Sequence, residues 1–254
     1  YREQVYCSVP GRADAPVTVR AYPRERAVID AGIAEFQTAP HEAWTPLDRG
    51  APGEFRSVRA YPNLRDVVGM FGDSFVGLQT YWSVDDLRAE NEMIVERPGE
   101  DWAPVYCGPG LWYDRATGHI HARLAHTHID NPLVSNYRGV TDPREVPLVI
   151  AGFRALPLFV DAATHVRFYD IILRGGGHDV AKLVFGVNIV FDRVFLLGGA
   201  NGLRAKGTGP FRMTNSAIYG IFPPWGFRTE QCSRRGSRRT TRPYADDPVL
   251  DETF

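Results

Sequence analysis

The chain has 254 residues, 44% hydrophobic and 23% charged, which is the composition of a globular protein with a sizeable core. Its formal net charge of −1 excludes the strong overall field of a protein that binds nucleic acid or a membrane surface by charge alone. No apolar run reaches the roughly 18 residues that a membrane-spanning helix needs.

Residues 1–34 are predicted to form a first coil of short strands. Apolar and polar residues alternate over residues 5–9 and 16–22, and a shorter apolar run covers residues 28–30. Turn residues separate these runs, namely Pro10-Gly11 and Pro23. Alternation with period two between turn residues is typical of strand–turn–strand structure and not of helix.

These runs carry a resemblance to a known superfamily. Residues 1–5, 15–23 and 28–30 resemble the opening coil of right-handed parallel β-helix proteins of the pectate-lyase-like superfamily. The family usually has Pro-Gly-Glu where this chain has Pro23-Arg24-Glu25, a departure at a turn. The resemblance covers residues 1–32 and, approximately, 150–230.

Many members of this superfamily are polysaccharide lyases and glycoside hydrolases. The resemblance therefore implies a secreted or periplasmic enzyme that acts on a polysaccharide or oligosaccharide. It does not specify the reaction, because one fold hosts many chemistries.

Residues 35–150 do not repeat and are predicted to be a small β-rich inserted domain. One short helix is expected over residues 83–91, where Ser83 provides the cap and Asp86 its box partner. Residues 109–124 are expected to form a hairpin that turns at residues 114–118. Similar hairpins occur in the β-domain inserted after the first coil of several β-helix glycosidases.

Residues 151–230 repeat at a fixed period, which predicts further coils. Residues 188–196 repeat residues 165–173 at an offset of 23, and residues 201–206 repeat residues 179–184 at an offset of 22. Glycines end each copy, and a looser third copy reaches residue 230. Such self-similarity is typical of a β-solenoid. The predicted fold is therefore all-β, a right-handed parallel β-helix interrupted by the inserted domain.

The repeat also predicts which side chains lie inside the coils. Alternation along the strands places six side chains in the core: Leu183, Ala205, Ile189, Phe191, Val194 and Leu196. Residues 231–254 are predicted to be an irregular charged loop or tail. Because a solenoid end needs a cap, we expect residues 208–254 to contact a second chain or missing coils.

The candidate site lies on the outward face of the repeated strand. One predicted column contains Phe159, Lys182, Arg204 and Arg228, and the next contains Asp161, Val184, Lys206 and Glu230. Both lysines of the chain fall on this face. Like charges roughly 4.8 Å apart repel, so the column is expected to bind an anion such as a uronic-acid carboxylate. The alternative is a set of solvated surface charges.

A cation column beside a base suits β-elimination. A cation holds the carboxylate and stabilises the enolate-like charge, while a base removes the neighbouring proton. The predicted catalytic residues are Lys206, Arg204, Lys182 and Asp161, with Lys206 or Lys182 as the base. The predicted substrate-binding residues are Arg228, Phe159, Glu230, His178 and Asp179.

Hydrolysis is the alternative reaction, and it needs two carboxyl groups about 5–5.5 Å or 6.5–9.5 Å apart. The candidates are Asp161, Asp179, Asp192 and Glu230, but stacking puts Asp161 and Glu230 roughly 14 Å apart. Asp170 and Asp192 are expected to satisfy backbone groups at corners. A second alternative is a non-catalytic glycan-binding or adhesive solenoid.

Other polar clusters are not expected to be sites. His119, His121, His126 and His128 with Asp130 match no established metal spacing and are expected to be surface imidazoles. No cofactor is expected. Calcium is the alternative, but the sequence contains no calcium-binding motif that supports it. The arginines of residues 234–242 lack interleaved aromatics, so neither nucleic acid nor membrane is expected as a partner. Cys7, Cys107 and Cys232 are expected to be buried small hydrophobic residues.

Overall fold

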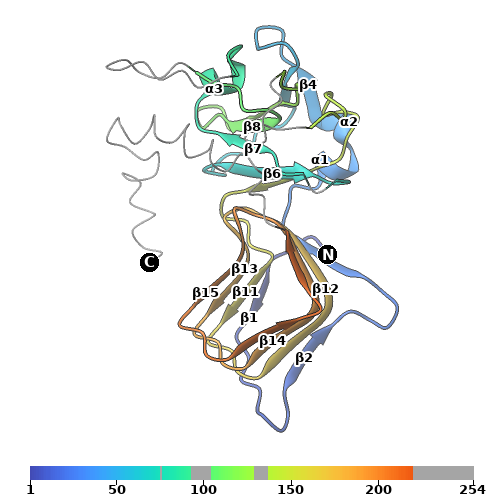
Figure 1. Cartoon of the computed structure of the whole chain (residues 1–254), viewed down its shortest axis with the longest axis vertical. Helices are drawn as coiled ribbons and strands as arrows, with labels where there is room; N and C mark the ends of the chain where they lie inside the picture. Colours follow the sequence, from blue (N-terminus) through green and yellow to red (C-terminus); the bar gives the residue numbers. More distant parts are fainter. Residues whose placement is uncertain (75, 93–103, 129–136, 220–254) are drawn as a thin grey trace. The chain divides into compact units, whose positions relative to one another are not determined.

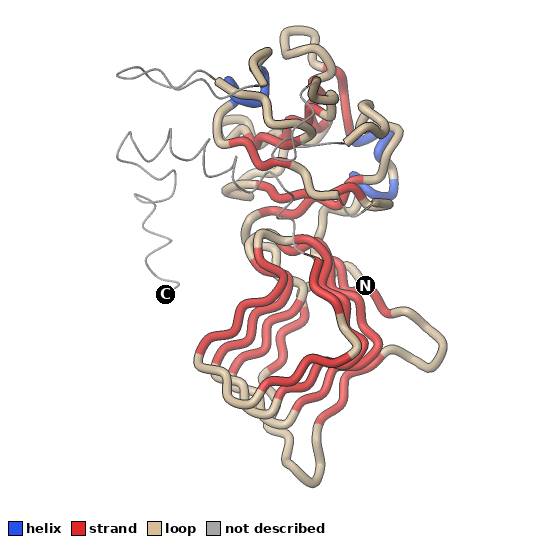
Figure 2. The backbone as a smooth tube through the Cα atoms, in the orientation of Figure 1, coloured by secondary structure: helices blue, strands red, loops and turns tan. Residues whose placement is uncertain are grey.

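The computed structural model describes residues 1–74, 76–92, 104–128 and 137–219. The described chain divides into two compact units. The first comprises residues 1–40, 64–77 and 146 to the last described residue, and the second comprises residues 41–63 and 78–145. Strands outnumber helices in both units, and the helices are short (Figure 2).

One parallel sheet of the first unit has four strands. They are, in spatial order, β1 (Val5–Cys7), β11 (Leu158–Asp161), β13 (Asp179–Val184) and β15 (Asn201–Lys206). The register pairs Phe159 with Lys182, and Lys182 with Arg204. These are the offsets of 23 and 22 that the sequence predicts. Figure 1 shows these strands side by side.

The second parallel sheet is built on two long strands, β12 (Val166–Gly176) and β14 (Ile189–Gly198), which pair with each other. On its outer edge β12 pairs with both β2 (Val17–Arg20) and β3 (Ala27–Asp30). β14 likewise pairs with β16 (Phe211–Thr214) and β17 (Ala217–Tyr219). Each pass of the chain thus adds one strand to the first sheet and one long or two short strands to the second.

The passes turn a corner within the second sheet. Asp170, Arg193 and Asn215 stand at this corner with φ of 58°, 54° and 51°, a left-handed conformation that Asn and Asp adopt more readily than most residues. In the first pass, Arg20 pairs with Tyr169 and Ala27 with Ile171. Residues 21–26 therefore occupy the corner where the second pass has Asp170 alone.

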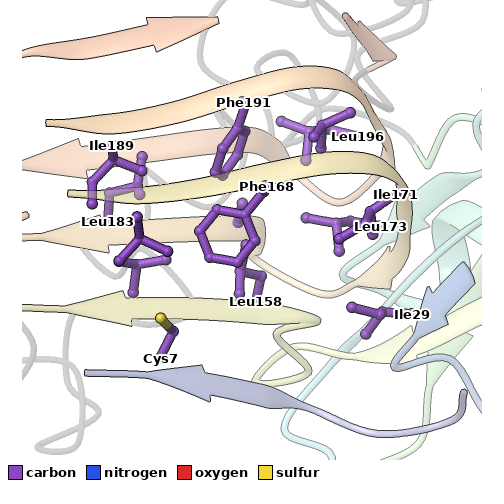
Figure 3. Packing of buried hydrophobic residues seen from close by; sticks show 14 of the residues in the cluster. Cys7, Ile29, Leu158, Phe168, Ile171, Leu173, Leu183, Ile189, Phe191 and Leu196 are labelled. Carbon is purple, nitrogen blue, oxygen red and sulfur yellow. The ribbon is translucent and has the colours of Figure 1, made fainter. Parts of the chain in front are cut away.

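The hydrophobic core of the first unit lies between the two parallel sheets. Phe168 and Phe191 stack edge to face with ring centroids 5.3 Å apart, and Phe211 continues the stack at the same spacing. Figure 3 shows the buried side chains of successive passes lying in rows. The predicted burial is confirmed for five residues, which are all 0% exposed: Leu183, Ile189, Phe191, Val194 and Leu196.

The burial predicted for Ala205 is wrong. Ala205 lies on β15, and its side chain is exposed. β15 is an edge strand of the sheet as far as the structure is described, so no further strand contributes side chains to cover it.

The predicted inserted domain of residues 35–150 does not form one unit, because parts of it belong to the first unit and parts to the second. Within it, β6 (Val67–Phe71) pairs antiparallel with β10 (Leu148–Gly152), and both strands belong to the first unit. The short helix α1 (Glu35–Thr38) also belongs to that unit. Met70 and Val149 bury their side chains against Leu197 of β14, which explains why these two strands stay with the parallel sheets.

The second unit contains a five-stranded sheet. Its spatial order is β4 (Trp44–Pro46), β5 (Glu54–Ser57), β9 (Ile120–Arg123), β8 (Gly110–Tyr113) and β7 (Gln79–Tyr81). The predicted hairpin is confirmed, because β8 and β9 are antiparallel and Gly118 N donates to the Asp114 carbonyl at 2.7 Å. A further short helix, α2 (Pro40–Ala43), precedes β4.

The predicted helix exists but is shorter than expected. It is α3 (Val84–Arg88), capped by Ser83, whose Oγ accepts from Asp85 N at 3.1 Å. Among the described residues, no helix is long and apolar enough to cross a membrane.

Candidate functional site

The outward face of β1, β11, β13 and β15 carries one continuous column of side chains. Register places Tyr6, Phe159, Lys182 and Arg204 opposite one another on successive strands. The sequence predicted the last three of these but not Tyr6. The alternation of residues 5–9 already held the signal, because Tyr6 is the outward residue between inward Val5 and Cys7.

Phe159 contacts both of its neighbours in this column through its aromatic ring. Tyr6 meets Phe159 edge to face at 5.3 Å between ring centroids. Lys182 Nζ lies 5.5 Å from the centroid of Phe159, within the range of a cation–π contact. Lys182 forms no salt bridge with any described residue, so its charge is available to an anion.

The neighbouring column contains Asp161, Val184 and Lys206 in register, as predicted. The Asp161 carboxylate accepts a hydrogen bond from Tyr6 Oη at 2.8 Å. This hydrogen bond, with some burial, raises the pKa of Tyr6. Lys206 is exposed and lies two strands from Asp161, roughly 10 Å by the usual strand spacing.

Arg204 pairs with Asp179, an acid that was not considered when repulsion within the column was predicted. Its Nε lies 3.1 Å from Oδ1 of Asp179, and its Nη2 lies 2.6 Å from Nδ1 of His178. Asn201 Nδ2 donates to the same carboxylate oxygen at 3.1 Å. The column is therefore not a run of unpaired cations, because Arg204 forms a salt bridge with Asp179.

The environment of Asp179 favours its charged form. Burial raises the pKa of this carboxyl, but the hydrogen bond with His178, the charges of His178 and Arg204, and Asn201 outweigh it and lower the pKa. Phe153 packs edge to face on His178 with 5.0 Å between centroids. The structure thus brings together the predicted substrate-binding residues His178 and Asp179 with Arg204 in one fixed cluster.

The described carboxylates of this face do not form a hydrolytic pair. Asp161 pairs with Val184, which lies five positions along β13 from Asp179. At about 3.3 Å per residue the two carboxylates are roughly 16–17 Å apart, beyond the 5–9.5 Å that glycoside hydrolysis uses. Two predicted site residues, Arg228 and Glu230, lie outside the described residues.

The corner aspartates behave differently from the prediction that they serve backbone groups. Arg193 Nε lies 2.6 Å from Asp170, and Arg193 Nη1 lies 2.7 Å from Asp192. Asp192 also accepts from Asn215 at 2.9 Å and from Thr214 at 3.1 Å. Their carboxylates therefore bind side chains of a neighbouring pass: Asp170 binds Arg193, and Asp192 binds Thr214 and Asn215.

The second unit holds a buried ionic network. The Glu54 side chain is fully buried, and it accepts from Arg88 Nε at 2.7 Å and contacts His121 Nδ1 at 2.7 Å. Burial raises the pKa of Glu54, but hydrogen bonds from His121, Arg88 and Ala51 outweigh it and lower the pKa to about 2. The expectation that His121 is a surface imidazole is wrong, because β9 carries it into this network.

The other three histidines of the predicted cluster, His119, His126 and His128, have separate partners. His119 Nδ1 lies 2.9 Å from the Ser57 carbonyl oxygen, His126 Nε2 lies 2.7 Å from that of Gly139, and His128 Nδ1 lies 3.0 Å from Glu92. The described parts of the chain contain no group of three or more acidic, His or Cys side chains arranged to hold a metal ion. Asp130 lies outside these parts.

The described cysteines, Cys7 and Cys107, are free and buried, and Cys232 lies outside the described residues.

The chain matches no protein-family model, and no curated protein or solved structure is significantly similar to it.

Proposed function

We propose that the first unit is a right-handed parallel β-helix and that the protein is a secreted or periplasmic enzyme that cleaves an acidic polysaccharide or oligosaccharide by β-elimination. The fold proposal is supported by two parallel sheets whose strands recur at offsets of 22 and 23. The functional proposal is carried by the column of Tyr6, Phe159, Lys182 and Arg204 on one outward face.

This column suits an acidic sugar chain that crosses the strands. Tyr6 and Phe159 offer aromatic surface for the apolar faces of sugar rings. Lys182 and Arg204 follow on the next two strands, each roughly 4.8 Å further on, and offer positive charge to a carboxylate.

Arg204 is the residue best suited to stabilise charge that develops on the carboxylate. Asp179 and His178 hold its guanidinium in place, so the arginine needs little reorganisation when the substrate becomes enolate-like. Lys182 adds a second positive charge from the neighbouring strand. Both contacts strengthen as negative charge moves onto the carboxylate oxygens.

Lys206 is the proposed base. It lies two positions beyond Arg204 on the same face of β15, roughly 7 Å along the strand. Its amine takes the proton from the carbon next to the carboxylate and becomes an ammonium group. The electrons of that C–H bond form a carbon–carbon double bond, the glycosidic C–O bond breaks, and the leaving oxygen is protonated by water.

Incubation with a panel of acidic and neutral glycans tests this proposal. New ultraviolet absorbance from an unsaturated uronide supports elimination. Reducing ends without that absorbance indicate hydrolysis. Binding without either product indicates a non-catalytic glycan-binding solenoid. Each of the last two outcomes rejects the lyase.

A further inference from the structure

A second surface of the first unit forms a groove that the proposed reaction does not use. The groove has a volume of about 1050 Å³ and lies against the second parallel sheet, beside the corner loop of residues 21–26. Its floor is provided by side chains of β12, β14 and β17. The column of Lys182 and Arg204 belongs to the other sheet and lines no part of it.

The corner loop builds one wall of this groove. Glu25 N donates to the Tyr22 carbonyl at 2.9 Å, and between them Pro23 is followed by Arg24 with φ of 70°. This is the pattern of a type II turn, whose third position is normally glycine. An arginine there is conformationally strained, and such strain clusters at ligand sites. The loop thus presents Tyr22, Arg24 and Arg26 at the rim, all exposed.

The floor of the groove is apolar and aromatic. Ile172, Phe195 and Ala217 lie opposite one another on successive strands, and Tyr219 follows Ala217 two positions along β17. Phe195 is 41% exposed, Tyr219 59% and Tyr22 75%, so three aromatic rings present large surfaces around one groove. Exposed aromatic surface concentrated in a concave region marks a binding site more often than a scattered apolar residue does.

The charges at the rim favour an anion. Arg193 is already paired with Asp170 and Asp192. Arg20, Arg24 and Arg26 form no salt bridge within the described part of the chain, and Glu25 is the acidic residue of the loop itself. The groove therefore combines aromatic surface with the guanidinium groups of Arg24 and Arg26, which form no salt bridge within the described residues. A guanidinium group binds a carboxylate through two parallel hydrogen bonds.

We propose that this groove is a second, non-catalytic binding site for an acidic oligosaccharide. Sugar rings pack their apolar faces on Tyr22, Phe195 and Tyr219, and their carboxylates pair with Arg24 and Arg26. An oligosaccharide suits the groove because three exposed aromatic rings and the guanidinium groups of Arg24 and Arg26 line the same cavity. The choice of a sugar as ligand rests on the proposed function, whereas the preference for an anion with apolar faces rests on the groove alone.

The test is calorimetric titration of the full chain with defined probes. Oligogalacturonates, alginate oligosaccharides and heparin-derived oligosaccharides are the acidic probes, and cello-oligosaccharides are the neutral one. Because the rim residues are exposed, Arg24→Ala combined with Arg26→Ala and, separately, Tyr22→Ala should leave the melting temperature unchanged. Each should weaken binding of the best acidic probe about tenfold or more.

A matched control separates local contacts from general charge. Arg12 is also an exposed arginine of the first unit, and it pairs with Asp14 away from the groove. Arg12→Ala should bind the acidic probes as the unaltered protein does. Equal weakening in Arg12→Ala and in the rim variants would show a non-specific charge effect and overturn the proposal.

The outcomes distinguish this proposal from the proposed function. Rim variants that bind every acidic probe normally overturn the groove site, even if Lys182→Ala abolishes cleavage. Probe binding that is lost in rim variants, in a protein that cleaves no glycan, supports the groove site and rejects the lyase.

Two other occupants would also overturn the proposal. One is the chain's own acidic segment, tested as a synthetic peptide of residues 243–254 that binds at the groove while no oligosaccharide does. The other is a second copy of the chain, shown by sedimentation if the unaltered protein is a dimer that the rim variants dissociate.

Discussion

Asp179 holds Arg204: the two side chains meet at 3.1 Å between Oδ1 and Nε, and the carboxylate is nearly buried. The pairing explains how an arginine can stand one strand from Lys182 without a large electrostatic penalty. It also makes Arg204 a fixed group, because a second contact with His178 restrains the far side of the guanidinium.

The first prediction concerns this pair. Asp179→Ala should lower the free energy of unfolding by about 1–3 kcal/mol, because it removes a nearly buried acceptor and leaves Arg204 unpaired. The double variant with Arg204→Ala should cost less than the sum of the single variants. Urea denaturation of the four proteins measures this coupling. Strict additivity would show that the contact does not contribute in solution.

The second prediction concerns Lys182 in the proposed reaction. Lys182→Met keeps most of the stem over Phe159 but removes the charge, so stability should stay within about 0.5 kcal/mol. Turnover on the cleaved acidic glycan should fall about 10²–10³-fold, as when other groups that stabilise a developing negative charge are removed. Turnover measured beside thermal unfolding separates the two effects. Normal turnover in Lys182→Met would remove this lysine from the site.

The third prediction concerns pH. The pKa of Glu54 is lowered from 4.5 to about 2, so its charged form contributes stability that is fully present above 4.5 and lost as the pH falls toward 2. The shift corresponds to about 3 kcal/mol. Glu54→Gln should therefore be clearly less stable than the unaltered protein at about pH 6 and nearly equal to it at about pH 2.

Denaturant titrations at several pH values check this behaviour. Arg88 and His121 face the carboxylate, so Arg88→Met should flatten the same pH dependence by removing one of its two side-chain partners. A stability difference between Glu54→Gln and the unaltered protein that did not change between these pH values would contradict the assignment.

The fourth prediction concerns the aromatic stack of the core. Phe191 is fully buried between Phe168 and Phe211, and Phe191→Ala should cost about 3–5 kcal/mol because both neighbours lose contacts. Phe185→Ala provides the control, since Phe185 is 61% exposed and its loss should cost less than about 1 kcal/mol. Equal losses in the two variants would be inconsistent with the described core.

The sequence predicted the parts of this fold that repeat. A fixed offset determines strand register directly, so the pairing of Phe159, Lys182 and Arg204 followed from spacing alone. Inward burial followed equally well from alternation, except at Ala205, where burial depends on a neighbouring strand and not on the residue's own pattern.

Contacts between unrelated segments were not predictable in the same way. Glu54 and His121 lie 67 positions apart in a region without repeats, so no periodicity linked them. The contact between Arg204 and Asp179 depends on the conformations of the two side chains, because the residue in register with Asp179 is Asn201. Alternation does not specify those conformations. Residues 64–77 likewise belong to the first unit because Met70 is buried there against Val149 and Leu197. No sequence repeat indicates that contact.

The corner of the first pass has a consequence for altering this protein. Six residues stand between Arg20 and Ala27, yet both flanking strands keep their register with β12, which has a single residue at the same place. The number of residues at that corner can thus differ between passes while the strand register stays the same. Foreign peptides exchanged for residues 22–25 should be displayed outward on an unchanged scaffold, which makes the corner a natural place to graft an epitope or a chemical label.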